Sequence, residues 1–227
     1  MEQTPPGRYM MYAFYRVAPS WYGQPKEEKS RAIAEYLARF EELSGTVTVR
    51  TYSTLGLKRH TDFLLWVISP ELPPAQAFFA GLRKTAMAPY LEEADTFLSV
   101  TRESIYTKAH KEDITVTVEP GKSQYLFVYP FVKSREWYLL PMEARQKLMN
   151  EHIRVGHEFP AIRINTSYSF GLDDQDFVVS FEGNDPKEFV TLVMRLRETE
   201  GSKYTVRDTP IFTCSRQPID EILWSLG

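Results

Sequence analysis

The 227-residue sequence contains one cysteine, Cys214, and has no apolar run near the roughly 18 residues that span a bilayer. A lone cysteine cannot form an intrachain disulfide, which favours a reducing, cytoplasmic setting. The N-terminal residues lack the charged-then-apolar order of a secretory signal, so we expect no export. A formal net charge of -3 offers no basic surface for nucleic acid or anionic lipid. We therefore expect neither nucleic acid nor membrane as a partner.

Several motifs that carry chemistry are also absent. The sequence has no phosphate-binding loop, no dinucleotide fingerprint and no Gly-x-Ser-x-Gly nucleophile elbow. His152 and His157 do not have the i, i+4 spacing of a helical metal chelate, and no Cys, His and carboxylate cluster predicts zinc. These absences exclude the commonest nucleotide, hydrolase and zinc sites.

Aromatic residues are plentiful, at 14% of the chain, and many alternate with other residues as in β-strands. The alternation predicts strands at residues 9–17, 46–54, 62–68, 96–103, 124–131, 161–170, 177–182 and 204–214. Helical spacing predicts helices at residues 26–43, 74–84, 141–157 and 186–198. The elements follow the order strand, helix, strand, strand, helix, strand, and then repeat it.

The two halves also resemble each other in residues. TYSTLGL at residues 51–57 corresponds to TSYSFGL at 166–172, and the interval from Asp62 to Leu82 equals that from Asp176 to Leu196. We predict a duplicated α+β fold of two ferredoxin-like units (βαββαβ twice) joined into a β-barrel-like domain. The expected boundaries are 1–105 for a scaffold half, 106–123 for a linker and 124–227 for a half that carries the functional site.

His152 distinguishes the second copy, because the corresponding first-copy helix has no histidine. It lies four residues after Leu148 and three before Val155, so it shares the helix face that those residues bury. One interpretation is a core or interface histidine bonded to a backbone carbonyl. The other is a single axial ligand to a haem iron. Position on the helix leaves both open.

The stretch from Tyr125 to Cys214 resembles the chlorite dismutase superfamily, and most closely its coproheme decarboxylase branch. The resemblance rests on YPFVK at 129–133, EWYLLP at 136–141, Glu151-His152, FGLDD at 170–174 and LRETE at 196–200. It implies two ferredoxin-like halves that form a barrel-like domain, usually assembled as a homopentamer. The first half resembles the family mainly through the duplicated fold.

The resemblance also implies roles for individual residues. His152 corresponds to the axial ligand of the haem iron, and Glu200 to the carboxylate that accepts the ligand's other ring N–H. Tyr129 corresponds to a tyrosine that relays an oxidising equivalent beside a propionate, and Lys133 to a lysine that pairs with a propionate. Further expected contacts to the cofactor come from Trp137, which is also expected in the core, and from Ser202.

The other side of the iron departs from the chlorite dismutases. Where those enzymes have an arginine over the iron, this sequence has Ile164. Arg163 is adjacent, but on a strand one residue turns the side chain to the other face. His110 in the linker is a candidate distal base. Without the arginine, decomposition of chlorite is disfavoured.

The resemblance thus implies a haem oxidoreductase whose cofactor is haem b or iron coproporphyrin (coproheme). The main hypothesis is oxidative decarboxylation of coproheme to haem b with hydrogen peroxide, in which Tyr129 and Lys133 act on the propionates. The alternatives are a haem-binding or haem-transfer protein without turnover, and a chlorite-decomposing enzyme.

Overall fold

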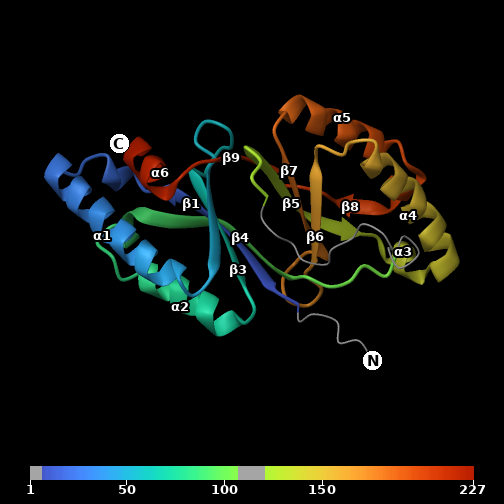
Figure 1. Cartoon of the computed structure of the whole chain (residues 1–227), viewed down its shortest axis with the longest axis horizontal. Coiled ribbons are helices and arrows are strands. Elements are labelled where there is room, and N and C mark those ends of the chain that lie inside the picture. Colours follow the sequence, from blue (N-terminus) through green and yellow to red (C-terminus); the bar gives the residue numbers. More distant parts are fainter. Residues whose placement is uncertain (1–6, 107–120) are drawn as a thin grey trace. The chain divides into compact units, whose positions relative to one another are not determined.

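The computed structural model describes residues 7–106 and 121–227, which form two compact units (Figure 1). Unit 1 comprises Met1–Val100 together with Thr213–Gly227, and unit 2 comprises Thr101–Phe212. Thr115 to Val118, where the sequence has a β-like stretch, and His110 lie outside the described residues. Within the described ranges, no helix is both long and apolar enough to cross a membrane.

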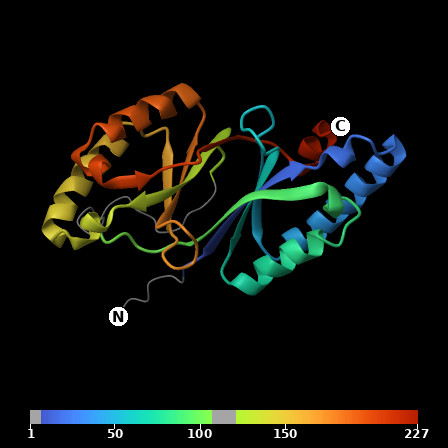
Figure 2. The same cartoon turned by 180° about the vertical axis from the view of Figure 1, so that it is seen from behind.

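Unit 1 has the ferredoxin-like order of elements. Its sheet has the strand order β4-β1-β3-β2, extended by β9 beside β2, and these neighbouring strands pair antiparallel. Helices α1 and α2 lie on one face of this sheet (Figure 2). The elements of this unit in chain order are β1 (Tyr9–Val17), η1 (Pro19–Trp21), α1 (Lys26–Ser44), β2 (Thr48–Ser53), β3 (Phe63–Ser69), α2 (Leu72–Leu82), η2 (Ala88–Tyr90), β4 (Leu91–Val100), β9 (Phe212–Arg216) and α6 (Ile219–Ser225).

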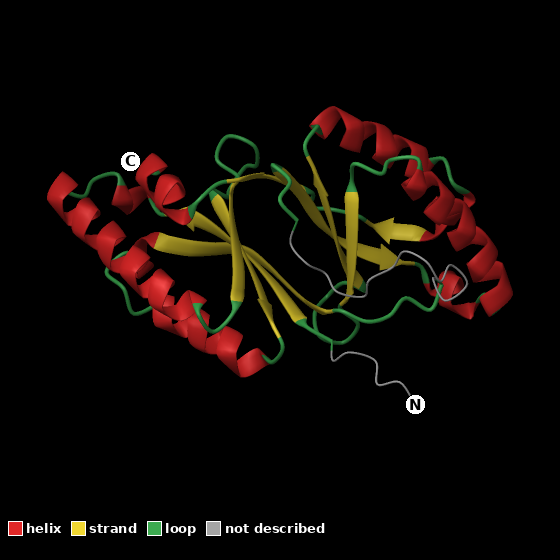
Figure 3. Ribbon diagram, in the orientation of Figure 1, coloured by secondary structure: helices red, strands yellow, loops and turns green. Residues whose placement is uncertain are grey.

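Unit 2 repeats that topology, with the strand order β6-β7-β5-β8 and antiparallel pairs throughout. Figure 3 shows its two long helices, α4 and α5, as a layer on one side of the strands. Its elements are β5 (Tyr125–Lys133), α3 (Arg135–Leu139), α4 (Met142–His157), β6 (Arg163–Tyr168), β7 (Phe177–Gly183), α5 (Pro186–Arg197), η3 (Glu200–Tyr204) and β8 (Thr205–Arg207). The predicted α+β class and the ferredoxin-like duplication are confirmed.

The same hydrogen bonds from a backbone N–H to an aspartate carboxylate recur in both units. The Asp62 carboxylate accepts from Val17 N at 2.7 Å, and the Asp176 carboxylate accepts from Lys133 N at 2.8 Å. The turns that precede these aspartates each contain a glycine in the left-handed region, Gly56 (φ 72°) and Gly171 (φ 71°). A residue with a Cβ would be strained at that φ, which explains glycine at both tips.

The aromatic packing is duplicated as well. Trp21 packs against Tyr90 with ring centroids 5.2 Å apart, and Trp137 packs against Tyr204 at 5.5 Å. The interval between the two tryptophans equals that between Val17 and Lys133. The duplication therefore assigns each residue near the second-copy site a counterpart in the first copy.

The structure differs from the predicted elements in several places. Residues 204–214 form two short strands, because Pro210 has no amide hydrogen to donate to a ladder. The strand predicted at 96–103 is β4, which begins earlier, at Leu91. The sequence did not predict its first half because that half is largely exposed and has few apolar residues. Two short helices, α3 and α6, carried no clear periodic signal.

The C-terminal residues also differ from the expected 124–227 unit. Thr213–Gly227 group with unit 1. Ile222 and Leu223 of α6 are fully buried in the unit 1 core, alongside residues of α1 and α2. Burial of these two apolar side chains accounts for the grouping.

Candidate functional site

His152 lies on α4, on the side of the helix that faces the sheet of unit 2. Gly156, one turn further along, lies against β6, since a Cβ built there would be 3.3 Å from the Ile164 Cδ1 atom. His152 is half-buried, whereas Val155 beside it is fully within the core. The helix thus presents an imidazole at the margin of the core.

The environment of His152 holds its imidazole in the neutral form. Burial, together with the nearby Lys133 ammonium, lowers its pKa from 6.5 to about 4, while Glu151 acts in the opposite direction. None of the described residues forms a hydrogen bond with this ring. A neutral imidazole has the free lone pair that a metal ion requires. One interpretation of His152 was a core histidine bonded to a backbone carbonyl. In the described part of the chain, no carbonyl accepts a hydrogen bond from its ring.

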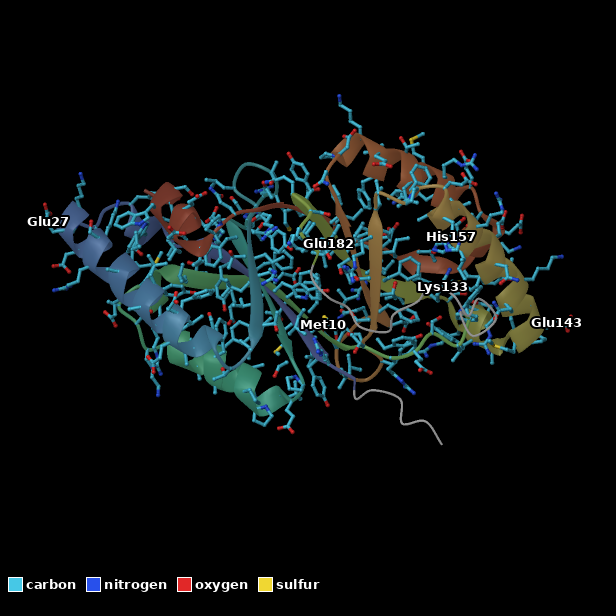
Figure 4. All side chains as sticks on the ribbon, viewed as in Figure 1. Met10, Glu27, Lys133, Glu143, His157 and Glu182 are labelled. Carbon is cyan, nitrogen blue, oxygen red and sulfur yellow. The ribbon has the colours of Figure 1, made fainter. Side chains whose placement is uncertain are left out.

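Lys133 is the second polar group near His152. Figure 4 shows Lys133 inside unit 2, whereas Glu143 of α4 points outward. Its Nζ donates to the Gly201 carbonyl at 2.8 Å. The same atom lies 4.7 Å from the centroid of the Trp137 ring and 5.3 Å from that of Phe131. Burial lowers the pKa of Lys133 from 10.5 to about 8. An ammonium held this way favours an anionic partner, which would raise its pKa again.

The register of β5 against β8 shifts between Val132 and Lys133. Such a bulge bends a strand and redirects the side chains beyond it. Lys133 follows Tyr129 by four residues, so the two side chains come near one another only if the strand bends, and the shift is an irregularity at that point.

Tyr129 lies on β5 with 7% of its surface exposed, in the core cluster that faces α4 and α5. Its ring stacks on Phe181 with centroids 5.9 Å apart. Burial raises the pKa of the Tyr129 phenol well above 10, Asp208 raises it further, and Arg197 opposes them. The phenol is thus protonated at neutral pH and screened from bulk water.

Ile164 lies on β6, opposite Phe181 of the same core cluster, so its side chain is on the sheet face that α4 covers. It remains 43% exposed, and Thr166, on the same face, is also exposed. Arg163 precedes Ile164 on the strand, so its side chain belongs to the opposite face. An aliphatic residue, and no arginine from this strand, faces the helix that carries His152.

Glu200 and Ser202 have other partners in this structure. The Glu200 carboxylate accepts from Lys203 Nζ at 2.8 Å and is largely exposed, while its backbone N–H donates to Glu151 at 3.0 Å. Ser202 Oγ donates to the Arg197 carbonyl at 2.8 Å. The predicted hydrogen bond from the His152 ring to Glu200 is not present among the described residues. Both residues nevertheless belong to η3, which packs against α4.

Trp137 is 2% exposed, as expected of a core aromatic. One face carries the Lys133 ammonium, and Tyr106 and Tyr204 pack around it. In this structure the Trp137 ring thus packs against the Lys133 ammonium.

The arrangement fits a flat, anionic iron complex. His152 provides one unpartnered nitrogen, Ile164 and Thr166 leave an uncovered strip of sheet on the α4 side, and Lys133 provides a positive charge. No group of three or more His, Cys, Asp or Glu side chains suited to a bare metal ion occurs in residues 7–106 and 121–227. A single protein ligand suits an iron whose other positions are filled by a macrocycle.

Comparisons with known proteins agree with this fit. The sequence model of the chlorite dismutase family, described as "Chlorite dismutase", matches residues 29–217. A coproheme decarboxylase of Mycolicibacterium smegmatis is 30% identical over 96% of this chain and 94% of its own length. A chlorite dismutase of Ideonella dechloratans is 28% identical over 98% of this chain and 81% of its own.

Solved structures are similar as well. The chlorite dismutase of Candidatus Nitrospira defluvii in complex with imidazole superposes with a TM-score of 0.89 at 28% identity, covering 98% of this chain and 96% of that one. A novel heme-binding protein of Thermus thermophilus has a TM-score of 0.81 at 26% identity, with coverages of 97% and 94%. With a duplicated ferredoxin-like fold, a matching family model over most of its length and a 30% identical relative, this chain belongs to the chlorite dismutase family.

Proposed function

We propose that this protein binds iron coproporphyrin and decarboxylates two of its propionates to vinyl groups with hydrogen peroxide, which yields haem b. The observation that carries the proposal is the grouping, in one layer of unit 2, of a neutral imidazole, a buried phenol and a buried ammonium. The 30% identity to a coproheme decarboxylase supports the choice of substrate.

The stoichiometry defines what the protein must handle. Each propionate loses its carboxylate as carbon dioxide and one hydrogen from the chain carbon attached to the porphyrin ring. The two electrons released reduce one hydrogen peroxide to two waters. Reduction of the peroxide would take place at the iron porphyrin when it is bound. The protein would supply an axial ligand, a relay for electrons and protons, and an anchor for the carboxylates.

His152 is the proposed iron ligand. Because burial and the Lys133 charge keep its ring neutral, the imidazole needs no deprotonation before it binds. Glu151, which precedes it, accepts a hydrogen bond from η3 and so fixes this end of the helix against η3.

Tyr129 is the proposed relay. A phenol can give up an electron and a proton together, and the resulting radical can take a hydrogen atom from a propionate side chain. Burial in an aromatic cluster protects such a radical from bulk solvent. Lys133 is the proposed propionate anchor, because a carboxylate would offer its ammonium a stronger partner than the Gly201 carbonyl.

Chlorite decomposition is the less favoured activity. Ile164 offers no positive charge or hydrogen-bond donor over the site, and Arg163 belongs to the other face of the strand. His110 stays a candidate distal base from the sequence, outside the described residues. Assembly as a homopentamer and a cytoplasmic location are part of the proposal; light scattering should then give a mass five times that of one chain.

The direct test is incubation of the purified protein with coproheme and stepwise additions of hydrogen peroxide, followed by chromatography of the porphyrins. We expect conversion to haem b at about two peroxides per coproheme. Stable binding of coproheme without haem b would support a haem-binding or haem-transfer protein instead. Oxygen release from chlorite would support the third hypothesis.

A further inference from the structure

The inner face of α4, which carries His152, is less covered than the matching face of α1. Lys29 and Arg145 each donate a backbone hydrogen bond to the carbonyl of the proline directly before the helix, so positions on the two helices correspond at a fixed interval. Every buried residue of α1 corresponds to a residue of α4 that is only half-buried. The α1 residues are Ala32, Ile33, Tyr36 and Phe40, and their counterparts are Leu148, Met149, His152 and Gly156. On its inner face α4 therefore has a partly open and mostly apolar strip.

Arg145 lies at the N-terminal end of this strip. It precedes His152 by seven residues, which places both side chains on one face of the helix, about 10 Å apart along its axis. Arg145 is half-buried, and its Nε atom is buried without a hydrogen-bond partner. Among the described residues, one Nη atom of its guanidinium donates to the Tyr106 hydroxyl, at 3.5 Å. Several of its donors are thus available to a further acceptor.

In unit 1 the corresponding cation has other partners. Lys29, the counterpart of Arg145, donates to a backbone carbonyl at 3.4 Å, and its Nζ lies 5.8 Å from the centroid of the Trp21 ring. In unit 2 the corresponding tryptophan is Trp137, and Lys133 lies over its ring instead, at 4.7 Å. Lys133 has thus taken the aromatic partner, and Arg145 has been left without it.

Arg145 and Lys133 approach the same aromatic corner of unit 2. Tyr106, which accepts from Arg145, packs against Trp137 with ring centroids 6.3 Å apart, and the Lys133 ammonium lies over Trp137. Within residues 7–106 and 121–227, neither cation forms an ion pair with a carboxylate; their acceptors are the Tyr106 hydroxyl and the Gly201 carbonyl. Two partly buried cations without a counter-charge favour a ligand that carries more than one carboxylate.

We propose that Arg145 binds a propionate carboxylate of the iron porphyrin, separately from the propionate assigned to Lys133. The inference rests on the proposed function, because it gives a second anionic group of the same ligand its partner. The spacing between Arg145 and His152 is comparable with the span from the centre of a porphyrin to the carboxylates at its edge. Leu148 and Met149 lie between the two and offer apolar side chains to the ring. A guanidinium can donate two parallel hydrogen bonds to one carboxylate, so the site selects iron porphyrins with ionised carboxylates.

The first test is a titration of the porphyrin-free protein with iron coproporphyrin, without peroxide. We expect Arg145→Gln to raise the dissociation constant about tenfold or more, because a hydrogen bond between charged groups is lost. Arg145→Lys should recover part of the affinity, since it restores the charge but not the planar fork. Lys147→Gln removes the same charge from an exposed position of α4 and should change the constant by less than about twofold. A constant within about twofold of wild type in Arg145→Gln would overturn the proposal.

The second probe is the methyl ester of iron coproporphyrin, which keeps the macrocycle and the iron but has no carboxylates. Arg145→Gln should bind this ester as the wild type does, because no ion pair is lost. An equal loss of affinity for the acid and the ester would mean that Arg145 only supports the packing of α4, and would contradict the proposal.

Formation of haem b separates this inference from the proposed function. Unchanged coproheme affinity in Arg145→Gln, with haem b formed by the wild type, contradicts the role of Arg145 alone. Lost affinity in Arg145→Gln, with no haem b formed by the wild type, contradicts the proposed reaction and leaves the carboxylate partner of Arg145 standing.

Discussion

Unit 1 and unit 2 share one frame but fill its interior differently. Pro25 and Pro141 stand directly before α1 and α4, and each accepts the same backbone hydrogen bond, from Lys29 and Arg145. The interval between these prolines equals that between the two tryptophans. Positions along α1 and α4 can therefore be compared one by one.

Three inner positions differ in kind. His152 stands where α1 has Tyr36, which is 1% exposed, and Gly156 stands where α1 has Phe40. On the first strand, Lys133 stands where unit 1 has Val17.

Unit 1 has two aromatic rings and a valine at these positions. Unit 2 has an imidazole, a glycine and a lysine there, and the exposed Ile164 lies across from that glycine. The same fold is thus a packed scaffold in one copy and a candidate ligand site in the other. Pairs of matched substitutions can test this contrast.

The largest contrast is expected between Tyr129→Phe and Tyr15→Phe. Removing the Tyr129 hydroxyl should lower the rate of haem b formation by about a hundredfold or more, because the relay loses its oxidisable group. Tyr15→Phe should change that rate by less than about twofold. Stopped-flow spectra with coproheme and peroxide measure both. Equal losses in the two variants would mean that the asymmetry between the copies is not functional.

Lys133 gives a contrast that depends on pH. Its folded pKa of about 8 lies below the unfolded value of 10.5, so between these values the unfolded chain binds more protons and stability rises with pH. Relative to Lys133→Met, the wild type should therefore gain up to about 3 kcal/mol as the pH rises from 8 to 10.5. Urea unfolding at several pH values measures the difference. Val17→Met should show no such trend, and a flat Lys133→Met difference would contradict a buried ammonium.

The repeated aspartates should differ by a smaller amount. Asp176 accepts from Lys133 N and also from the Tyr138 hydroxyl at 2.7 Å, whereas Asp62 accepts from Val17 N. Asp176→Ala should therefore destabilise more than Asp62→Ala, by about 1–2 kcal/mol for the additional hydrogen bond to a charged group. Chemical denaturation checks this order, and the reverse order would show that the second copy does not use Asp176 to fix α3.

The smallest expected contrast lies between the two glycine turns. Gly56 and Gly171 have nearly the same φ, and a Cβ at either would meet no atom within 4 Å. Each glycine-to-alanine substitution should cost about 1 kcal/mol through backbone strain alone, and the two costs should be equal within about 0.5 kcal/mol. Thermal unfolding measures both. Unequal costs would mean that one of the two turns makes stabilising contacts with residues outside the turn.

Much of the fold was predictable because it depends on local sequence patterns that occur in both halves of the chain. Alternating aromatics identified the strands, and the equal interval from each repeated aspartate to its leucine identified the duplication. The strand at 204–214 was predicted as one element because its apolar pattern continues, although Pro210 interrupts the ladder. The short helix α6 and its return to unit 1 depend on tertiary burial of Ile222 and Leu223, which no local pattern encodes.

The candidate site was less predictable than the frame. The motifs identified His152, Tyr129 and Lys133, but the Gly201 carbonyl that accepts from Lys133 carries no motif and lies far from it in the chain. Glu200 was expected beside His152 from its place in the chain, but Lys203 on the same helical turn is the partner found for its carboxylate.

The central claim is that His152 has become a ligand where Tyr36 remains packing. The most direct measurement is a coproheme titration, followed in the Soret region, of wild type, His152→Ala and Tyr36→Phe. We predict that His152→Ala raises the dissociation constant by about a hundredfold or more, an amount near 2.7 kcal/mol, and changes the spectrum. Tyr36→Phe should bind as the wild type does. Wild-type affinity and an unchanged spectrum in His152→Ala would contradict the account.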